Sequence, residues 1–274
     1  MDDTLAYSSA GRGEPLVLVH GLGSRRQIWD PLIDRLAERC EVFAVDLRGF
    51  GESPVGDSSA IDGQMDALAE FCARHGLDRP HVAGNSMGGA LALELGRRGA
   101  ARSVTAFSPV GFWHTPGRVW GQASLATTRR LAARLQPRMP TLLRSPVLRA
   151  AVLGLVFGRP TAIDPEIVLG DIAGLVAAPG FEQACASFTG YRFTDPGLLD
   201  EIPTTVAWGT RDVLLTYALQ HRRARAQLPR ALHVALCGCG HTPFYDDPQL
   251  CARTILETVE RVRPVVDNVP ITEG

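Results

Sequence analysis

The sequence predicts an α/β protein built on a mostly parallel, doubly wound sheet. Short, continuous apolar runs alternate along the chain with stretches of helical periodicity. Such alternation is typical of a parallel sheet whose two faces are both covered by helices. The chain has 274 residues, of which 45% are hydrophobic and 21% charged. These values suit one domain with a large core and exclude global disorder.

Six apolar runs are predicted as strands, at residues 16–19, 42–45, 81–83, 104–107, 205–208 and 232–235. Helical patterns fill the intervals, at residues 31–39, 61–75, 87–98, 216–227 and 249–261. The strand candidates are short and mainly apolar, as a strand buried on both faces requires. A further short strand or hairpin near residues 5–9 is expected to add antiparallel strands at one edge.

The alternation stops between residues 112 and 195, where the pattern is helical and interrupted by prolines. We expect residues 112–195 to form an inserted helical cap, or lid, over one end of the sheet. Residues 1–111 and 196–263 then form the core. Residues 264–274 contain two prolines and are expected to be a flexible tail.

The first half of the predicted cap is strongly cationic. Eleven arginines and no acidic residue lie between Glu94 and Asp164. Arg130, Arg134 and Arg138 recur every four residues, which is typical of a solvated stripe on an amphipathic helix. The alternative is a function of the stripe: attraction of an anionic partner, such as a carboxylated substrate, an acyl carrier protein or an anionic membrane surface.

Composition excludes several classes of function. The net charge of −1 gives no overall basic character for nucleic acid. All 28 basic residues are arginine, which excludes lysine Schiff bases and P-loop lysines. The N-terminus has no signal-peptide pattern, and the longest apolar run, at residues 150–158, is too short to span a membrane. We therefore expect a cytoplasmic protein with free thiols, as a monomer or homodimer.

Residues 84–88 read Gly-Asn-Ser-Met-Gly and match the G-x-S-x-G motif. The motif follows a predicted strand and opens a predicted helix, which is the context that it requires. A sharp strand–turn–helix exposes the serine hydroxyl, and bulky side chains two residues to either side would collide. Ser86 is therefore predicted to be a nucleophile.

A serine nucleophile needs a base and an acid that orients the base. His241 and Asp212 follow two predicted strands, at the carboxyl edge where open α/β sheets place their sites. The order Ser86, Asp212, His241 is the order of α/β-hydrolase triads. The loop after residues 104–107 offers no carboxylate, and Asp246 and Asp247 lie too close behind His241.

Backbone N–H groups are predicted to hold the oxyanion of the reaction. Leu22, in the loop after the first apolar strand, and Met87, directly after the nucleophile, supply these donors. The loop is no dinucleotide motif, because Arg26 replaces its third glycine. Trp113, Trp120 and Phe157, with Leu22 and Met87, are predicted to line an apolar acyl pocket; ordinary core packing is the alternative.

The run Cys237-Gly238-Cys239-Gly240-His241 lacks the further ligands and the spacing of zinc motifs, so we expect no metal. Cys237 and Cys239 would instead make a nearby site sensitive to oxidation.

The chain resembles the α/β-hydrolase fold superfamily over nearly its whole length. The resemblance rests on residues 20–23, 46–53, 84–89, 209–212 and 240–241, with the sequences HGLG, DLRGFGES, GNSMGG, GTRD and GH. It implies an eight-stranded, mostly parallel sheet with a helical cap between the sixth and seventh strands. It also implies a serine mechanism without a cofactor. Dehalogenases and epoxide hydrolases of this fold carry aspartate where Ser86 stands.

The expected function is hydrolysis of a carboxylic ester, lactone or thioester of a small apolar acyl substrate through an acyl-enzyme. The GNSMGG elbow is similar to that of C–C bond hydrolases of meta-cleavage-type diketones, although Thr242 follows the histidine where those enzymes commonly have Trp. The segment at residues 46–49 is more like that of esterases, enol-lactonases and cofactor-free perhydrolases. A non-catalytic ligand-binding protein is the alternative outside the enzymes.

Overall fold

The computed structural model describes residues 4–262, so the predicted tail at 264–274 lies outside the described residues. The described chain forms one seven-stranded sheet with the strand order β1-β3-β2-β4-β5-β6-β7. The strands are β1 (Tyr7–Ala10), β2 (Glu14–Val19), β3 (Cys40–Val45), β4 (His81–Asn85), β5 (Ser103–Phe107), β6 (Thr204–Gly209) and β7 (Leu232–Leu236). All pairs are parallel except β1 with β3. The predicted mostly parallel α/β fold is confirmed, and each of the six predicted apolar strands is present.

The expected count of eight strands is wrong for the described residues, which hold seven. The antiparallel edge consists of β1 alone, because residues 4–6 ahead of it form no strand. β1 and β2 do not pair as a hairpin. Gly11 and Gly13 join them with positive φ angles of 82° and 128°. β3 lies between β1 and β2 in the sheet, and β1 pairs with β3, placing Tyr7 opposite Val45.

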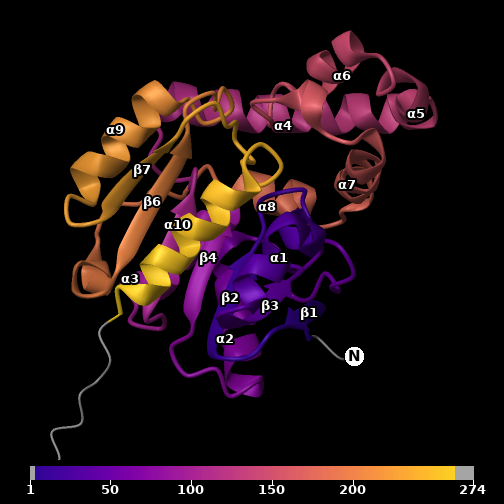
Figure 1. The fold of residues 1–274 in the computed structure, drawn as a ribbon. Helices are drawn as coiled ribbons and strands as arrows, with labels where there is room; N and C mark the ends of the chain where they lie inside the picture. The colour runs from indigo at the N-terminus through magenta and orange to yellow at the C-terminus, as the bar shows by residue number, and fades with distance from the viewer. Residues whose placement is uncertain (1–3, 263–274) are drawn as a thin grey trace, which may run out of the picture.

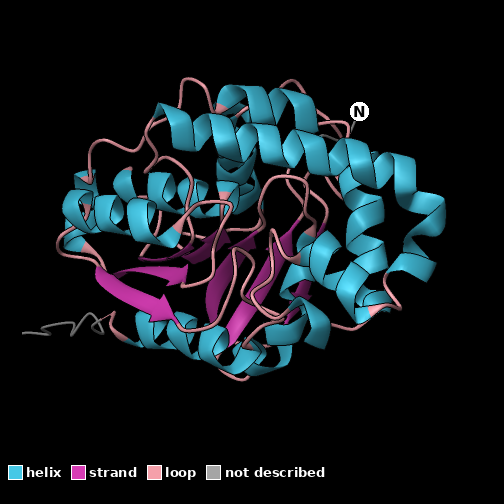
Figure 2. Cartoon of the chain, turned by 90° about the horizontal axis from the view of Figure 1, so that it is seen from above, coloured by secondary structure: helices cyan, strands magenta, loops and turns pink. Residues whose placement is uncertain are grey.

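Helices cover both faces of the sheet (Figures 1 and 2). Helices α1 (Asp30–Ala37) and α10 (Pro248–Glu260) pack with Leu16 and Leu18 of β2 against one face. Helices α2 (Ile61–Arg74), α3 (Met87–Arg97) and α9 (Tyr217–Gln227) pack with Val17 and Val19 against the other. Successive β2 side chains alternate between the two apolar layers, which explains its continuous apolar run.

The chain between β5 and β6 is helical and lies across the upper end of the sheet in Figure 1. Its α-helices are α4 (Thr115–Leu135), α5 (Met139–Leu142), α6 (Pro146–Leu153), α7 (Pro165–Ala177) and α8 (Phe181–Ser187). We call residues 112–195 the helical segment. It has an apolar cluster of its own, including Leu143, Leu153 and Ile172. Its status as a separate cap domain stays a prediction.

Within residues 4–262, no single helix is long and apolar enough to cross a membrane. Helices α7 and α8 reach that length and composition only together, as a pair bent by 79°.

Candidate active site

Ser86 occupies the sharp turn between β4 and α3, with φ 57° and ψ −114°. Residues other than glycine rarely adopt a positive φ, so the surrounding backbone must hold Ser86 in this conformation. The Ser86 N–H donates to the carbonyl of Phe107 at 2.9 Å. A Cβ at Gly84 would lie 2.1 Å from the Gly88 carbonyl oxygen, and one at Gly88 would lie 2.1 Å from that of Val19. The two glycines of the motif therefore let β4, α3 and β2 meet.

His241 and Asp212 form a buried pair beside this turn. His241 Nδ1 lies 2.8 Å from Asp212 Oδ2, and the two side chains are 5% and 0% exposed. The other carboxylate oxygen, Oδ1, accepts the N–H groups of Leu214 at 3.0 Å and Leu215 at 2.8 Å. Because a carboxylate only accepts, His241 Nδ1 carries the proton and Nε2 is left as an acceptor.

The loop after β2 packs directly against the elbow. A Cβ at Gly21 would lie 3.0 Å from Ser86 Cβ, so only glycine allows this approach. The side chain of Leu22 lines the same cavity as Ser86, and Met87 is the first residue of α3. Among residues 4–262, the N–H groups of Leu22 and Met87 have no hydrogen-bond acceptor. Both are therefore free to bind an anion.

His20 fixes the shape of this loop. The ring is fully buried, and burial lowers the pKa of His20, which keeps the imidazole neutral. A neutral ring satisfies both contacts: Nδ1 donates to the carbonyl of Gly21 at 2.8 Å, and Nε2 accepts the N–H of Leu47 at 3.0 Å. His20 thereby connects the ends of β2 and β3.

Two further side chains position the His241 loop, and neither is found from the sequence motifs. Asn85, next to the nucleophile, donates to the carbonyls of Phe107 at 3.2 Å and His241 at 3.0 Å. Asp246 is buried and accepts three backbone N–H groups, from Gly158, Arg159 and Gly240, at 2.7–2.8 Å. Asp246 therefore connects the His241 loop to the helical segment.

At this connection the backbone of the His241 loop packs directly against the backbone of the helical segment. A Cβ at Gly240 would lie 2.5 Å from the Gly158 nitrogen, and one at Gly158 would lie 2.3 Å from the Gly238 carbonyl oxygen. The Thr242 N–H also donates to the carbonyl of Val156 at 2.8 Å. The glycines around the histidine thus serve close packing. The Gly-His dipeptide after a strand does not by itself predict this contact with the backbone of residues 156–158.

Ser86 and His241 open into one apolar cavity of about 350 Å³. Most of its wall comes from the helical segment, chiefly from α4, α6 and α7, through side chains such as Ala132, Leu153 and Ile172. Asp171 of α7 is the one carboxylate on the wall. Its Oδ1 accepts Arg25 Nε at 3.1 Å, and burial raises the pKa of its carboxyl. The cavity thus joins the elbow to the helical segment.

Of the three predicted pocket aromatics, Phe157 lies on the cavity wall, whereas Trp113 and Trp120 do not. Trp113 is 2% exposed and packs on Phe188 in the core, and its indole N–H donates to the carbonyl of Tyr191 at 3.2 Å. Trp120 is 52% exposed on the outside of α4. For Trp113 the alternative of ordinary core packing is right, and small aliphatic side chains take the expected place of the two tryptophans.

No three His, Cys, Asp or Glu side chains within residues 4–262 gather as a metal site would require. Cys239 is buried, and burial raises the pKa of its thiol to about 12, so it is a poor nucleophile at neutral pH. Cys237 is exposed. The sulfur of Cys239 points to the carbonyl of Cys237 at 4.0 Å.

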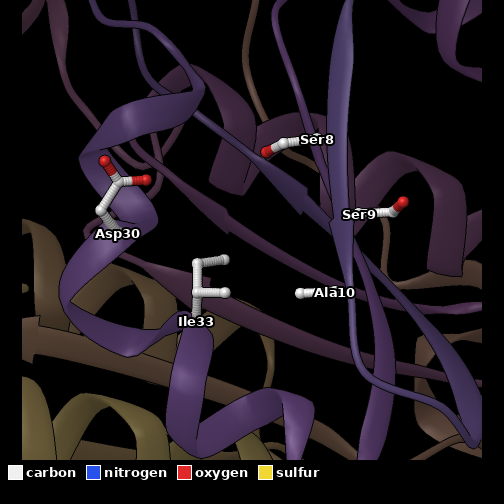
Figure 3. Close-up of a pocket in the computed structure, with 5 residues that line it drawn as sticks. All are labelled: Ser8, Ser9, Ala10, Asp30 and Ile33. Atoms are coloured by element: carbon white, nitrogen blue, oxygen red, sulfur yellow. The ribbon is translucent and has the colours of Figure 1, made fainter.

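A second cavity, of about 270 Å³, lies between β1 and α1 and is lined by Ser8, Ser9, Ala10, Asp30 and Ile33 (Figure 3). Burial raises the pKa of the Asp30 carboxyl. No histidine lines this cavity, so neither serine has there the base that Ser86 has in His241. It is therefore not the candidate site.

The chain belongs to the alpha/beta hydrolase family, which it matches over residues 16–254. An uncharacterized protein of Mycobacterium tuberculosis is 27% identical over 258 residues, covering 89% of this chain and 74% of that one. The pimeloyl-[acyl-carrier protein] methyl ester esterase of Methylococcus capsulatus is 29% identical over 264 residues, covering 93% and 98%. The solved structure of a membrane phospholipase A is 27% identical, with a TM-score of 0.75, and covers 95% and 83%. These findings support a hydrolase.

Proposed function

We propose that the protein is a serine hydrolase that cleaves a carboxylic ester, lactone or thioester with an apolar acyl group. One observation carries the proposal: the strained elbow serine and His241, whose ring is paired with Asp212, line the same apolar cavity. Structural packing alone does not require a serine at positive φ beside a buried imidazole with a free Nε2. Strained backbone conformations of this kind concentrate at catalytic sites.

In the proposed reaction, Ser86 Oγ attacks the substrate carbonyl carbon and His241 Nε2 takes the hydroxyl proton. The N–H groups of Leu22 and Met87 bind the oxyanion that forms. His241 then gives the proton to the leaving oxygen or sulfur, and the C–O or C–S bond breaks to leave an acyl-enzyme. Water, deprotonated by His241, releases the acid. Asp212 holds the imidazole and stabilises its charged form.

The cavity indicates the kind of acyl group. Its volume of about 350 Å³ would hold roughly a dozen methylene-sized groups, if each takes about the 30 Å³ of a liquid water molecule. Apart from the elbow region, the polar lining is sparse, so the acyl part should be a hydrocarbon chain. The name of the Methylococcus relative, a methyl ester esterase, supports ester cleavage.

A series of chromogenic esters with short to long acyl chains tests the proposal on wild type and Ser86→Ala. We expect turnover with a medium-chain optimum, and a loss of at least about 10³-fold in Ser86→Ala without a change in Tm. A fluorophosphonate probe should add one phosphonyl group to wild type at Ser86 and none to the variant. Equal turnover by the two proteins would refute the role of Ser86.

If folded wild type hydrolyses no ester and takes no phosphonate, the proposal fails. Turnover of a vinylogous diketone by that protein would then indicate the C–C hydrolase that the elbow sequence also resembles.

A further inference from the structure

The helical segment carries exposed arginines that no residue among 4–262 pairs with. Arg130, Arg134, Arg138 and Arg144 are all exposed. Within residues 4–262, none of their guanidinium groups makes a hydrogen bond or an ion pair. Some other arginines are paired: Arg129, on the same helix, binds Glu182 at 3.0 Å. The stretch that carries these arginines has no acid of its own, because none occurs from residue 95 to 163.

Apolar side chains are exposed on the same part of the molecule. Val147 and Leu148, at the start of α6, are 77% and 42% exposed. Leu131 of α4 is 49% exposed. Exposed single aliphatic residues are common on protein surfaces. Here Leu131 follows Arg130 directly, Val147 and Leu148 come three and four residues after Arg144, and both helices that carry them also line the cavity.

The cavity reaches the surface between these helices. Leu131 of α4 and Ala151 of α6 line the cavity and are also exposed, so they mark its mouth. Ala151 lies one helical turn from Val147 and Leu148, on their face of α6. Arg130 and Arg134 lie one residue before and three residues after Leu131. Exposed apolar groups and free guanidinium groups therefore lie close in the chain to Leu131 and Ala151, the two residues that mark the opening.

We propose that this rim docks on an anionic phospholipid surface, so that the cavity mouth opens toward the acyl chains. We define the rim as Arg130, Arg134, Arg138, Arg144, Val147 and Leu148. Anionic headgroups would neutralise the arginines, while Val147 and Leu148 enter the boundary between headgroups and acyl chains. The helices would lie on the surface without crossing it. The assignment of lipid as substrate rests on the proposed function; docking itself does not.

An acidic protein partner would match the arginines but not the apolar groups. The most exposed of these, Val147, lies one helical turn from Ala151, which lines the cavity mouth. A bilayer offers both kinds of partner at once, charge at its surface and hydrocarbon a few ångströms below. A soluble acyl carrier protein is therefore the competing occupant in the test.

Docking is measured with Ser86→Ala protein, so that turnover does not alter the vesicles. Sedimentation compares vesicles of phosphatidylcholine alone with vesicles containing phosphatidylglycerol. We expect binding only to the anionic vesicles, weakening with salt. Arg130→Gln, Arg134→Gln and Arg138→Gln together should weaken it by about 100-fold, since each arginine near an anionic surface contributes about fivefold. Val147→Ser with Leu148→Ser should weaken it by about tenfold or more.

The matched control is Arg222→Gln, Arg225→Gln and Arg230→Gln. It removes the same charge from and just beyond α9, away from α6 in Figure 1. It should weaken binding by less than about threefold, which is a long-range effect of charge. The unfolding temperature of every variant verifies its fold.

Three outcomes would overturn the proposal: no binding to anionic vesicles, equal loss in the rim and control variants, or binding to purified acyl carrier protein without binding to vesicles. Turnover of a short, soluble ester by wild type tests the hydrolase function separately. A protein that cleaves that ester but ignores vesicles refutes docking alone.

Discussion

The sheet and the helical segment build the two halves of the candidate site in different ways. At the sheet, main-chain contacts position the chemistry: the elbow is fixed by backbone within 2.1 Å of two glycine Cβ positions, and Asp212 is held by two backbone N–H groups. In the helical segment, aliphatic side chains form the wall. Side chains change with each substitution, whereas backbone contacts do not. The catalytic geometry at the sheet can therefore be kept while substitutions in the helical segment change the shape of the cavity.

The two regions also differ in packing. The sheet residues Val17 and Val19 are fully buried among helices on one face, and Leu16 and Leu18 on the other. In the helical segment many apolar side chains, such as Leu135 and Val152, are only partly buried. Less burial means less free energy lost when the segment rearranges. Substitutions of matched type in the two regions should therefore have unequal effects.

The largest expected effect lies at the sheet. Asp212→Asn should lower kcat for ester hydrolysis by about 10⁴-fold, with little change in Tm. The Asn side-chain oxygen can still accept the Leu214 and Leu215 N–H groups, but its NH₂ group faces His241 Nδ1. The imidazole would then present N–H to Ser86 instead of an acceptor. Steady-state kinetics of wild type and variant measure the change.

Near-wild-type activity of Asp212→Asn would mean that another carboxylate orients the histidine. It would also contradict the contrast between the two regions, because the reaction would no longer depend on the carboxylate that the backbone N–H groups hold.

A matched pair of leucines compares the stability of the regions. Leu91→Ala, in α3 under the sheet, should lower the free energy of unfolding by about 4 kcal/mol, because it leaves a closed cavity among fully buried neighbours. Leu153→Ala should cost only about 2 kcal/mol, since Leu153 already lines an open cavity. Denaturant unfolding measures both values.

The same two variants also distinguish effects on stability from effects on the preferred acyl chain length. Leu153→Ala enlarges the acyl cavity and should move the ester optimum to longer chains, whereas Leu91→Ala should leave the optimum unchanged. Equal losses of stability, or an unchanged optimum in Leu153→Ala, would show that the helical segment is as rigid as the sheet.

Sequence patterns predict the sheet side well because its requirements are local. Buried strands need continuous apolar runs, and the strand–turn–helix at Ser86 needs glycine at two fixed positions. The predicted strands and helices match the structure to within a few residues. The eighth strand is the exception: it came from the resemblance, and no apolar run of this chain supports it.

The helical segment is less predictable for a physical reason. An amphipathic helix shows which side is apolar, but not whether that side meets the core, a cavity or solvent. Trp113 and Trp120 look alike in sequence, yet one is buried and the other is 52% exposed. The partnership of Asp246 with Gly158 joins residues 88 positions apart, and no local pattern encodes such a contact. The residues that line the pocket could therefore be identified only from the structure.

Asp246 offers the smallest and sharpest test, because it joins the two regions. Asp246→Asn keeps one acceptor oxygen and places an NH₂ group against buried backbone donors. We expect a loss of about 2 kcal/mol in the free energy of unfolding and about tenfold in kcat, since the NH₂ group must face at least one of the buried N–H groups of Gly158, Arg159 and Gly240 and displaces the loop that carries His241. Asp247→Asn is the matched control: Asp247 only caps α10 through the Leu250 N–H at 2.9 Å, and asparagine caps helices equally well. Its stability should change by less than about 0.5 kcal/mol. Similar behaviour of the two variants would mean that the His241 loop keeps its place without the helical segment, and that the two halves of the site are mechanically independent.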